Sequence, residues 1–282
     1  MTYDEALKNA YVLLEKAQVP DFRHDAELLM EYAAGVDSAH LLLNREEQMS
    51  EQVRGSFERL LERRLQREPL QYILGSWEFM GLKFKCGPEC LIPRQDTELL
   101  AMTAITAVRD FRTAGEVRLL DLCTGSGCVI ISVKHYEERI RAFGADISSE
   151  ALEAARKNAE MNGTEVDFRL SDMFGAFEKE QFDIITANPP YIETDVIEGL
   201  NPEIRVFEPR IALDGGTDGL KHYRSIAAGA LDHLVSGGRL LLEIGDTQGE
   251  AVFSLLEDSG YAGVGIRKDL AGLDRVVTAY KP

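Results

Sequence analysis

The chain has 282 residues, which is enough for one large domain or two of ordinary size. A hydrophobic content of 45% and a charged content of 28% are typical of a globular protein and argue against a disordered or fibrous one. No run approaches the roughly 18 consecutive apolar residues of a membrane helix, and the first residues lack the pattern of a secretory signal. We therefore expect a cytoplasmic monomer that does not bind a membrane.

The formal net charge of −17 bears on what the chain can bind. Proteins that grip duplex nucleic acid usually present a basic surface, because phosphate contacts supply most of the non-specific affinity. The arginines between positions 54 and 67 alternate with Glu58 and Glu62, which is the pattern of a solvated helix face. These arginines are Arg54, Arg59, Arg63, Arg64 and Arg67. The charge balance therefore weighs against nucleic acid as a substrate.

Residues 1–75 are predicted to form a small helical bundle. Thr2 and Glu5 fit a capping box ahead of a first helix, which ends before Pro20. A second helix runs to Gly35, and a third spans roughly positions 48–66 with apolar residues at helical spacing. The region contains no group of residues that could carry out catalysis. It could therefore dock a substrate, or it could simply complete the fold, and its residues do not favour either role.

Apolar residues at strand-like spacing follow in residues 76–93. They surround the turn-forming pair Gly87-Pro88 and include Trp77, Phe79, Leu82, Phe84 and Leu91. This pattern predicts a β-hairpin that links the helical bundle to a larger catalytic domain over residues 94–282.

The four cysteines are Cys86, Cys90, Cys123 and Cys128. The spacing of Cys86 and Cys90 resembles half of a zinc site, but a closed site needs four ligands and the histidines are scattered. We expect reduced cysteines and no bound metal.

Apolar strands alternate with helical stretches from about residue 115 onward, which predicts an α/β fold with a mostly parallel sheet flanked by helices. Strands are expected at 117–122, 142–146, 166–170, 182–187, 239–244, 261–267 and 275–280, and helices at 130–136, 150–161, 217–235 and 248–258. The last two strands follow each other so closely that they should pair antiparallel. Seven strands ending in such a pair form the Rossmann-like sheet of S-adenosylmethionine-dependent methyltransferases, whereas a dehydrogenase would continue the alternation.

Small and acidic residues stand at the ends of three successive strands. The first strand opens into Cys123-Thr124-Gly125-Ser126-Gly127, where small residues let the backbone approach a ligand closely. Asp146 closes the second strand and Ile147 follows it, and the Asp146 carboxylate is placed to accept hydrogen bonds from ribose hydroxyls. Asp172 and Met173 follow the third strand, where they can meet the amine and the face of an adenine.

These residues are expected to bind S-adenosylmethionine, although NAD would use a similar loop and carboxylate. The full dinucleotide fingerprint would place a small residue where Ile130 stands, to let the helix pack around a pyrophosphate. S-adenosylmethionine has no phosphate and does not require that residue, so the pattern favours it over NAD.

The fourth strand runs directly into Asn188-Pro189-Pro190-Tyr191, a motif that suits methylation of a planar nitrogen. The lone pair of an amide or nucleobase amine is delocalised, so the nitrogen is a poor nucleophile. The Asn188 side-chain oxygen and the Pro189 carbonyl can accept hydrogen bonds from the two N–H groups of this nitrogen. The prolines stiffen the turn that holds these acceptors. Tyr191 can lie against the planar substrate. We predict Asn188, Pro189 and Tyr191 as catalytic residues and all four as substrate-binding, with Asn188 also beside the cofactor.

Over nearly its whole length the chain resembles the protein-(glutamine-N5) methyltransferases of peptide chain release factors, the PrmC/HemK family. Segments 69–75, 92–98, 121–127, 188–191, 207–209 and 241–245 carry the resemblance. It implies methylation of the glutamine in the Gly-Gly-Gln motif of release factors, which the helical domain helps to grip. It also implies that residues 123–127, Asp146, Met173 and Asn188 line the cofactor and that residues 188–191 hold the glutamine.

The sequence departs from the family pattern in three places. Cys123 stands where relatives often have glycine, Met173 where some have an aromatic residue, and Gln95-Asp96 where Pro-Glu is usual.

Three other functions are compatible with parts of the sequence. A nucleic-acid adenine or guanine N-methyltransferase shares the Asn-Pro-Pro-aromatic motif, but the acidic charge and the resemblance weigh against it. An NAD-dependent oxidoreductase leaves residues 188–191 unexplained. A docking protein without catalysis predicts that Asn188→Ala leaves function intact.

Overall fold

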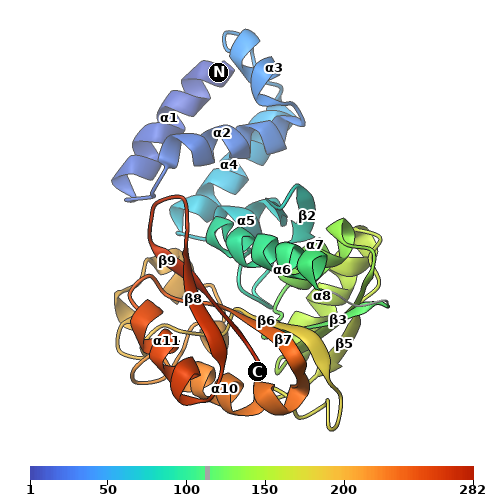
Figure 1. Ribbon diagram of the computed structural model, residues 1–282. Helices are drawn as coiled ribbons and strands as arrows, with labels where there is room; N and C mark the ends of the chain where they lie inside the picture. Colours follow the sequence, from blue (N-terminus) through green and yellow to red (C-terminus); the bar gives the residue numbers. More distant parts are fainter. Residues whose placement is uncertain (112–114) are drawn as a thin grey trace. The chain divides into compact units, whose positions relative to one another are not determined.

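The computed structural model describes residues 1–111 and 115–282, and these divide into two compact units. Unit 1 contains Met1–Gly75 together with Asn201–Phe207, and unit 2 contains Ser76–Leu200 and Glu208–Pro282. A short segment from the second half of the chain therefore belongs with the N-terminal helices, which the sequence pattern did not indicate. Figure 1 follows the chain from the blue helices of unit 1 to the red strands at the end of unit 2.

Unit 1 is helical, as predicted. Its helices are α1 (Tyr3–Lys16), α2 (Phe22–Ala34), α3 (Ser38–Leu43), α4 (Glu51–Leu65), α5 (Leu70–Leu74) and the short α9 (Pro202–Arg205). The capping box is confirmed, since Glu5 N donates to Thr2 Oγ1 at 3.2 Å and Thr2 N donates to Glu5 Oε2 at 2.9 Å. Helices α3 and α5 were not predicted, because five or six residues are too few for a helical period to show.

Arg64 of α4 and Arg67, which follows the end of that helix, differ from the sequence prediction. Arg64 is only 4% exposed, and its guanidinium donates to Asp25 Oδ2 at 2.7 Å and to Glu203 Oε1 at 2.9 Å. Arg67 donates to both carboxylate oxygens of Glu203, at 2.7 and 2.6 Å. The prediction of a solvated helix face is wrong for Arg64 and Arg67, because their partners come from segments distant in sequence. This buried ion-pair cluster ties α9 to the helices of unit 1.

Unit 2 begins with the antiparallel hairpin β1 (Ser76–Phe79) and β2 (Leu82–Lys85). Its turn lies at Met80-Gly81, both with positive φ (53° and 74°), and not at Gly87-Pro88 as predicted. A type I′ hairpin turn needs positive φ at both positions, and Met-Gly is a weaker sequence signal for it than Asn-Gly. Leu91 lies beyond the hairpin, in an irregular segment.

The main sheet of unit 2 has seven strands in the order β5-β4-β3-β6-β7-β9-β8. The strands are β3 (Val117–Leu122), β4 (Ile140–Asp146), β5 (Asp167–Leu170), β6 (Phe182–Ala187), β7 (Leu234–Glu243), β8 (Ala262–Lys268) and β9 (Asp274–Tyr280). Strands β3 to β7 pair in parallel, while β9 pairs antiparallel with both β7 and β8 (Figure 1). The predicted α/β fold and its final antiparallel pair are confirmed.

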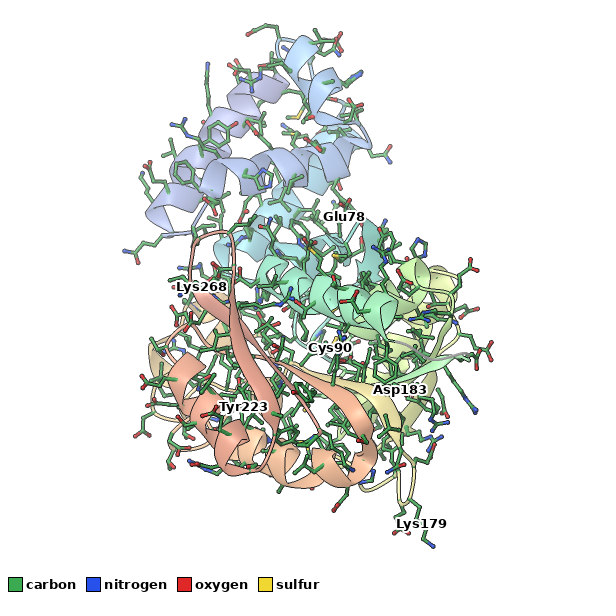
Figure 2. The ribbon with its side chains drawn as sticks, in the orientation of Figure 1. Glu78, Cys90, Lys179, Asp183, Tyr223 and Lys268 are labelled. Carbon is green, nitrogen blue, oxygen red and sulfur yellow. The ribbon has the colours of Figure 1, made fainter. Side chains whose placement is uncertain are left out.

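Two apolar clusters cover the two faces of this sheet. Neighbouring residues of one strand, such as Leu119 and Leu120, belong to opposite clusters because side chains alternate across a strand. The helices of unit 2 are α6 (Glu98–Asp110), α7 (Cys128–Tyr136), α8 (Ser149–Met161), α10 (Lys221–His233) and α11 (Gly249–Asp258), with single turns η1 (Gln95–Thr97), η2 (Ile197–Gly199) and η3 (Arg210–Ala212). Helices α6 and α7 contribute to one cluster and α10 and α11 to the other, where Tyr223 (labelled in Figure 2) is fully buried. Helix α6 was not predicted.

The strand order reverses at β3, because the chain proceeds from β3 outward to β5 and then returns to the other side of β3 as β6. A crevice at the carboxyl ends of the strands is expected at such a point. In the part of the chain that the structure describes, no helix is both long and apolar enough to cross a membrane.

Candidate active site

A cavity of about 760 Å³ in unit 2 is lined by the segments that follow β3, β4, β5 and β6. The sequence-predicted residues Cys123, Thr124, Gly125, Ser126, Asp146, Ile147, Asp172, Met173, Asn188 and Pro190 all line it. The sheet thus brings together groups that lie up to 67 positions apart in the chain (from Cys123 to Pro190). Gly127, Pro189 and Tyr191 lie outside this lining.

The loop after β3 has an unusual backbone, with positive φ at Cys123 (53°), Gly125 (53°) and Gly127 (78°). A cysteine in this region is strained relative to glycine, at a cost of about 1 kcal/mol or more. A Cβ on Gly127 would lie 2.8 Å from Ile131 Cδ1 and 3.2 Å from Ala155 Cβ. Gly127 therefore serves the close packing at the start of α7, and it does not face the cavity.

Asp121, the penultimate residue of β3, holds the loop after β3 in place through hydrogen bonds. It is 2% exposed, and its two carboxylate oxygens accept hydrogen bonds from Thr124 Oγ1 and Thr186 Oγ1, each at 2.7 Å. Burial raises the pKa of Asp121 to about 7, although the two hydroxyl donors oppose the shift. The residue ties the loop to β6, so the conformation of the loop depends on the tertiary structure.

Asp146 joins the end of β4 to the same loop. Its Oδ2 accepts from Gly125 N at 2.8 Å, and its Oδ1 accepts from Ser148 N at 2.9 Å. Burial raises the pKa of this carboxyl, while the backbone donors oppose that rise. Each oxygen has a second acceptor site, so the carboxylate can still accept hydrogen bonds from a ligand diol.

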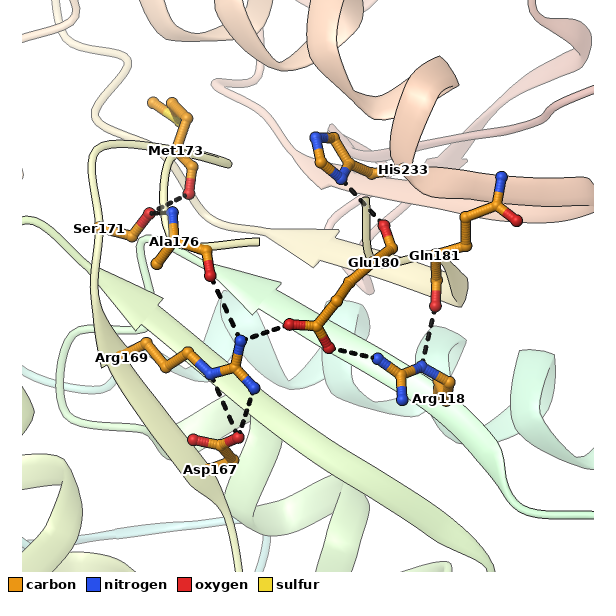
Figure 3. Close-up of polar contacts among 9 residues, drawn as sticks. All are labelled: Arg118, Asp167, Arg169, Ser171, Met173, Ala176, Glu180, Gln181 and His233. Carbon is orange, nitrogen blue, oxygen red and sulfur yellow. Dashed lines mark hydrogen bonds and ion pairs between the residues drawn. The ribbon is translucent and has the colours of Figure 1, made fainter. Parts of the chain in front are cut away.

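A polar network shapes the loop that carries Asp172 and Met173, shown in Figure 3. Ser171 Oγ donates to the Met173 carbonyl at 2.8 Å and accepts from Ala176 N at 3.0 Å, while Arg169 Nη1 donates to the Ala176 carbonyl at 3.3 Å. These contacts stabilise Met173 at a φ of 47°, a conformation that is uncommon for a side chain of its size. Met173 thereby lines the cavity.

Asn188 stands where β6 ends, and its Nδ2 donates to Thr97 Oγ1 at 3.2 Å. Tyr191, three residues later, packs against the core cluster on the α10 face, and its burial raises the pKa of the phenol to about 12. That Tyr191 lies against the substrate stays a prediction.

The backbone of Tyr191 is closely enclosed. Gln248 Nε2 donates to the Tyr191 carbonyl at 3.0 Å, and a Cβ on Gly215 would lie 2.7 Å from Tyr191 Cα. The next residue, Ile192, donates its N–H to Leu213 and accepts from Gly215 N at 2.8 Å. The motif is therefore supported from two distant parts of the chain and has little freedom to move.

Arg94 and Glu208 form an ion pair beside the cavity. The Arg94 side chain is 37% exposed and lines the cavity, whereas that of Glu208 is 1% exposed. Burial raises the pKa of Glu208, and the neighbouring guanidinium opposes the rise. No spacing rule connects positions 94 and 208, so the pair could not be predicted.

A family model described as the PrmC N-terminal domain matches residues 5–75, and one described as the methyltransferase small domain matches residues 100–200. A protein of Thermodesulfovibrio yellowstonii named release factor glutamine methyltransferase is 40% identical over 91% of this chain and 92% of its own. One of Neisseria gonorrhoeae with the same name is 43% identical over 89% and 91% of the two chains. The chain belongs to the release factor glutamine methyltransferase family.

The fold has relatives beyond this family. A methyltransferase of Pyrococcus furiosus, known from its crystal structure, aligns with 71% of this chain and 89% of its own, with a TM-score of 0.52. Its sequence identity is 20%, so the match supports the fold alone.

Several residues at or near this cavity were not predicted from the sequence. Arg94 and Thr97 line the cavity, Gln248 supports the Asn188–Tyr191 motif from outside it, and the buried Glu243 lies outside the lining. Arg94, Thr97 and Glu243 fall inside segments that carried the resemblance, and that was the only available signal. Among the described residues, no three or more His, Cys, Asp or Glu side chains form a group that could hold a metal ion.

Proposed function

We propose that the chain transfers the methyl group of S-adenosylmethionine to the side-chain amide nitrogen, N5, of the glutamine in the Gly-Gly-Gln motif of peptide chain release factors. The observation that carries this proposal is the place of Asn188, which lines one cavity together with the loop after β3, Asp146 at the end of β4 and Asp172 after β5. Membership of the family supports the choice of a glutamine amide over a nucleobase amine.

The lining residues fit the proposed cofactor. A diol and an adenine amine present hydrogen-bond donors, and the cavity offers the carboxylates of Asp146 and Asp172. Gly125 donates its N–H to Asp146, and because it has no side chain a ligand can approach the loop backbone closely. Cys123, Thr124, Ser126, Ile147 and Met173 would complete the cofactor site.

When bound, S-adenosylmethionine supplies an electrophilic methyl group. Asn188 Oδ1 and the Pro189 carbonyl would accept hydrogen bonds from the two N–H groups of the glutamine amide and so orient its nitrogen. The prolines hold these acceptors in place, because their rings restrict the backbone. The protein then acts mainly by positioning the amide against the methyl group. Such positioning can lower the activation barrier by on the order of 7 kcal/mol or more in favourable cases.

We also propose the role of each region. Residues 1–75 would help to dock the release factor, residues 76–93 would link the regions, and residues 94–282 would carry out catalysis. The protein would act as a cytoplasmic monomer. An acidic chain suits a protein substrate better than nucleic acid, since phosphate binding relies on positive charge.

Mass spectrometry of a release factor after incubation with the protein and labelled methyl donor tests the proposal. A single methyl group on the glutamine of Gly-Gly-Gln is expected. Label in DNA or RNA, with none in the release factor, would contradict it. Tight binding of NADH without binding of S-adenosylhomocysteine would instead favour an oxidoreductase.

A further inference from the structure

We propose that Asn158 is a positioning residue for the cofactor, because it ties the loop after β3 to the end of the β1–β2 hairpin. Residues 123–126 of that loop line the cavity, and so do residues 89–94, which follow the hairpin. Asn158 lies outside the lining, so it acts on a ligand through these two segments. The inference rests on the proposed function, in which the cavity holds S-adenosylmethionine.

Asn158 is a polar residue on the buried face of α8. Asparagine is a poor helix former and is mostly exposed in proteins, so neither helix formation nor apolar packing accounts for it here. Its side chain is 0% exposed, and a buried amide needs hydrogen-bond partners. The partners of Asn158 therefore indicate its role. The other buried residues of α8 are all apolar: Ala151, Leu152, Ala155 and Ala159.

Both halves of the Asn158 amide are hydrogen-bonded to backbone groups. Its Oδ1 accepts from Lys85 N at 2.8 Å, and its Nδ2 donates to the Ser126 carbonyl at 3.0 Å. A backbone N–H can only donate and a backbone carbonyl can only accept. The exchanged orientation of the amide would place donor against donor and acceptor against acceptor. Asn158 is therefore fixed in one orientation, in which it joins Lys85 to Ser126.

One end of this link is the cofactor loop itself. Ser126 is 3% exposed and lines the cavity. Helix α8 also meets the loop one turn earlier, since a Cβ on Gly127 would lie 3.2 Å from Ala155 Cβ. Loss of the Asn158 amide would deprive the Ser126 carbonyl of a buried donor, which favours a shift of the loop that carries Ser126.

The other end of the link fixes where the second segment begins. Lys85 is the last residue of β2, and residues 89–94 start four positions later. This segment lies against the cofactor loop, since a Cβ on Gly125 would be 4.0 Å from Cys90 Cβ. Asn158 therefore sets the spacing of two segments that line one cavity. Segments that are held in place before a ligand binds need not be ordered by it, which favours tight binding.

Asn158→Asp tests the link at nearly constant shape. An ionised carboxylate can accept from Lys85 N but cannot donate to the Ser126 carbonyl, so only the loop end of the link is broken. At pH 8 we expect S-adenosylhomocysteine to bind roughly tenfold more weakly or worse by calorimetry, because a buried acceptor loses its donor. The KM for S-adenosylmethionine should rise in parallel, while kcat at saturating cofactor stays within about threefold of wild type, because the Asn188 motif is unchanged.

Lowering the pH supplies a readout that a purely structural role would not change. Burial favours the neutral form of the new carboxyl group, and a protonated carboxyl offers one donor and one acceptor, as the asparagine amide does. The ratio of variant to wild-type dissociation constants should therefore approach one as the pH falls from 8 to 6. Titration of Asp146 is common to both proteins and cancels in this ratio. A loss of affinity that is the same at both pH values would overturn the inference.

Asn158→Ala removes both hydrogen bonds and keeps the test decisive if Asn158→Asp folds poorly. It should weaken S-adenosylhomocysteine binding roughly tenfold or more at either pH. Asn162→Ala is the matched control, because Asn162 Nδ2 donates to the Lys83 carbonyl at 2.9 Å and so ties the same helix to the hairpin and not to the loop. The control should bind within about twofold of wild type, since the loop keeps its donor. Wild-type affinity of Asn158→Ala, or equal losses in the two alanine variants, would overturn the inference.

The proposed function is judged separately, on the wild-type protein. A wild-type protein that does not bind S-adenosylhomocysteine would contradict both the proposed function and this inference. A wild-type protein that binds it, together with an Asn158→Ala variant that binds it equally well, would contradict this inference alone.

Discussion

The two units of this protein are stabilised in different ways. Unit 1 places an ion-pair cluster in its interior, where Arg64 and Arg67 hold Glu203 of a segment far along the chain. Unit 2 covers both faces of its sheet with apolar clusters and keeps its buried carboxylates, Asp121 and Glu243, beside the cavity. The buried ion pairs of unit 1 therefore join distant chain segments, whereas in unit 2 the buried carboxyl group of Asp121 holds the loop of the candidate site.

The largest effect should come from the motif that defines the site. Asn188→Ala removes the proposed side-chain acceptor, and we expect kcat/KM to fall by roughly 100-fold or more, because a positioned hydrogen-bonding group contributes on that scale. Melting temperature and S-adenosylhomocysteine affinity should change little. Asn44→Ala in unit 1 is the matched control and should keep full activity. Undiminished turnover of Asn188→Ala would refute the role assigned to this residue.

The cofactor loop can be tested through its packing. Gly127→Ala places a Cβ within 2.8 Å of Ile131 Cδ1 at a φ of 78°. We expect a loss of about 2–4 kcal/mol in unfolding free energy from strain and overpacking, and at least tenfold weaker S-adenosylhomocysteine binding by calorimetry.

Gly163→Ala serves as the control for this change, since Gly163 also has a positive φ (63°) but open space around it. It should cost only about 1 kcal/mol and leave binding intact. Equal effects of the two variants would show that close packing at Gly127 is unimportant.

Breaking the ion-pair cluster of unit 1 should reduce stability without affecting cofactor binding. Glu203→Gln leaves two arginines without their shared carboxylate, and breaking a buried pair in this way costs about 3 kcal/mol. Chemical denaturation should show the loss, while S-adenosylhomocysteine affinity stays within about twofold because the cavity lies in unit 2. Glu58→Gln, at an exposed pair, should cost less than about 0.5 kcal/mol. A larger effect on cofactor binding than on stability would contradict the contrast between the units.

The smallest expected effect concerns pH. Burial raises the pKa of Asp121 to about 7, above its ordinary value near 4, so the folded chain holds this proton more tightly than the unfolded chain. Stability from this group is present below the unfolded pKa and is lost as pH rises toward 7, with a slope of at most about 1.4 kcal/mol per pH unit.

Urea denaturation at pH 5 and pH 8 measures this dependence. Wild type should lose more unfolding free energy between these pH values than Asp121→Asn, by roughly 2–3 kcal/mol. Identical losses in the two proteins would mean that Asp121 is ionised throughout this range.

Local patterns determined much of this protein. Strands β3 and β6 begin and end at the predicted residues, because apolar runs next to the glycine loop and the Asn188 motif leave little choice of boundary. The capping box at Thr2 and the antiparallel final pair also follow from neighbouring residues. Most predicted cofactor residues line one cavity, since the ends of neighbouring parallel strands meet at one edge of a sheet.

Only the tertiary structure decided which distant side chains support one another. The arginines of α4 look solvated in sequence, but Asp25 and Glu203 bury Arg64. Asn188 meets Thr97, which lies 91 positions earlier in the chain, because the fold and not chain order sets their distance. The sequence identified the residues that could carry out the chemistry, whereas the fold determined how those residues are oriented, since hydrogen-bond direction depends on partners that no local pattern encodes.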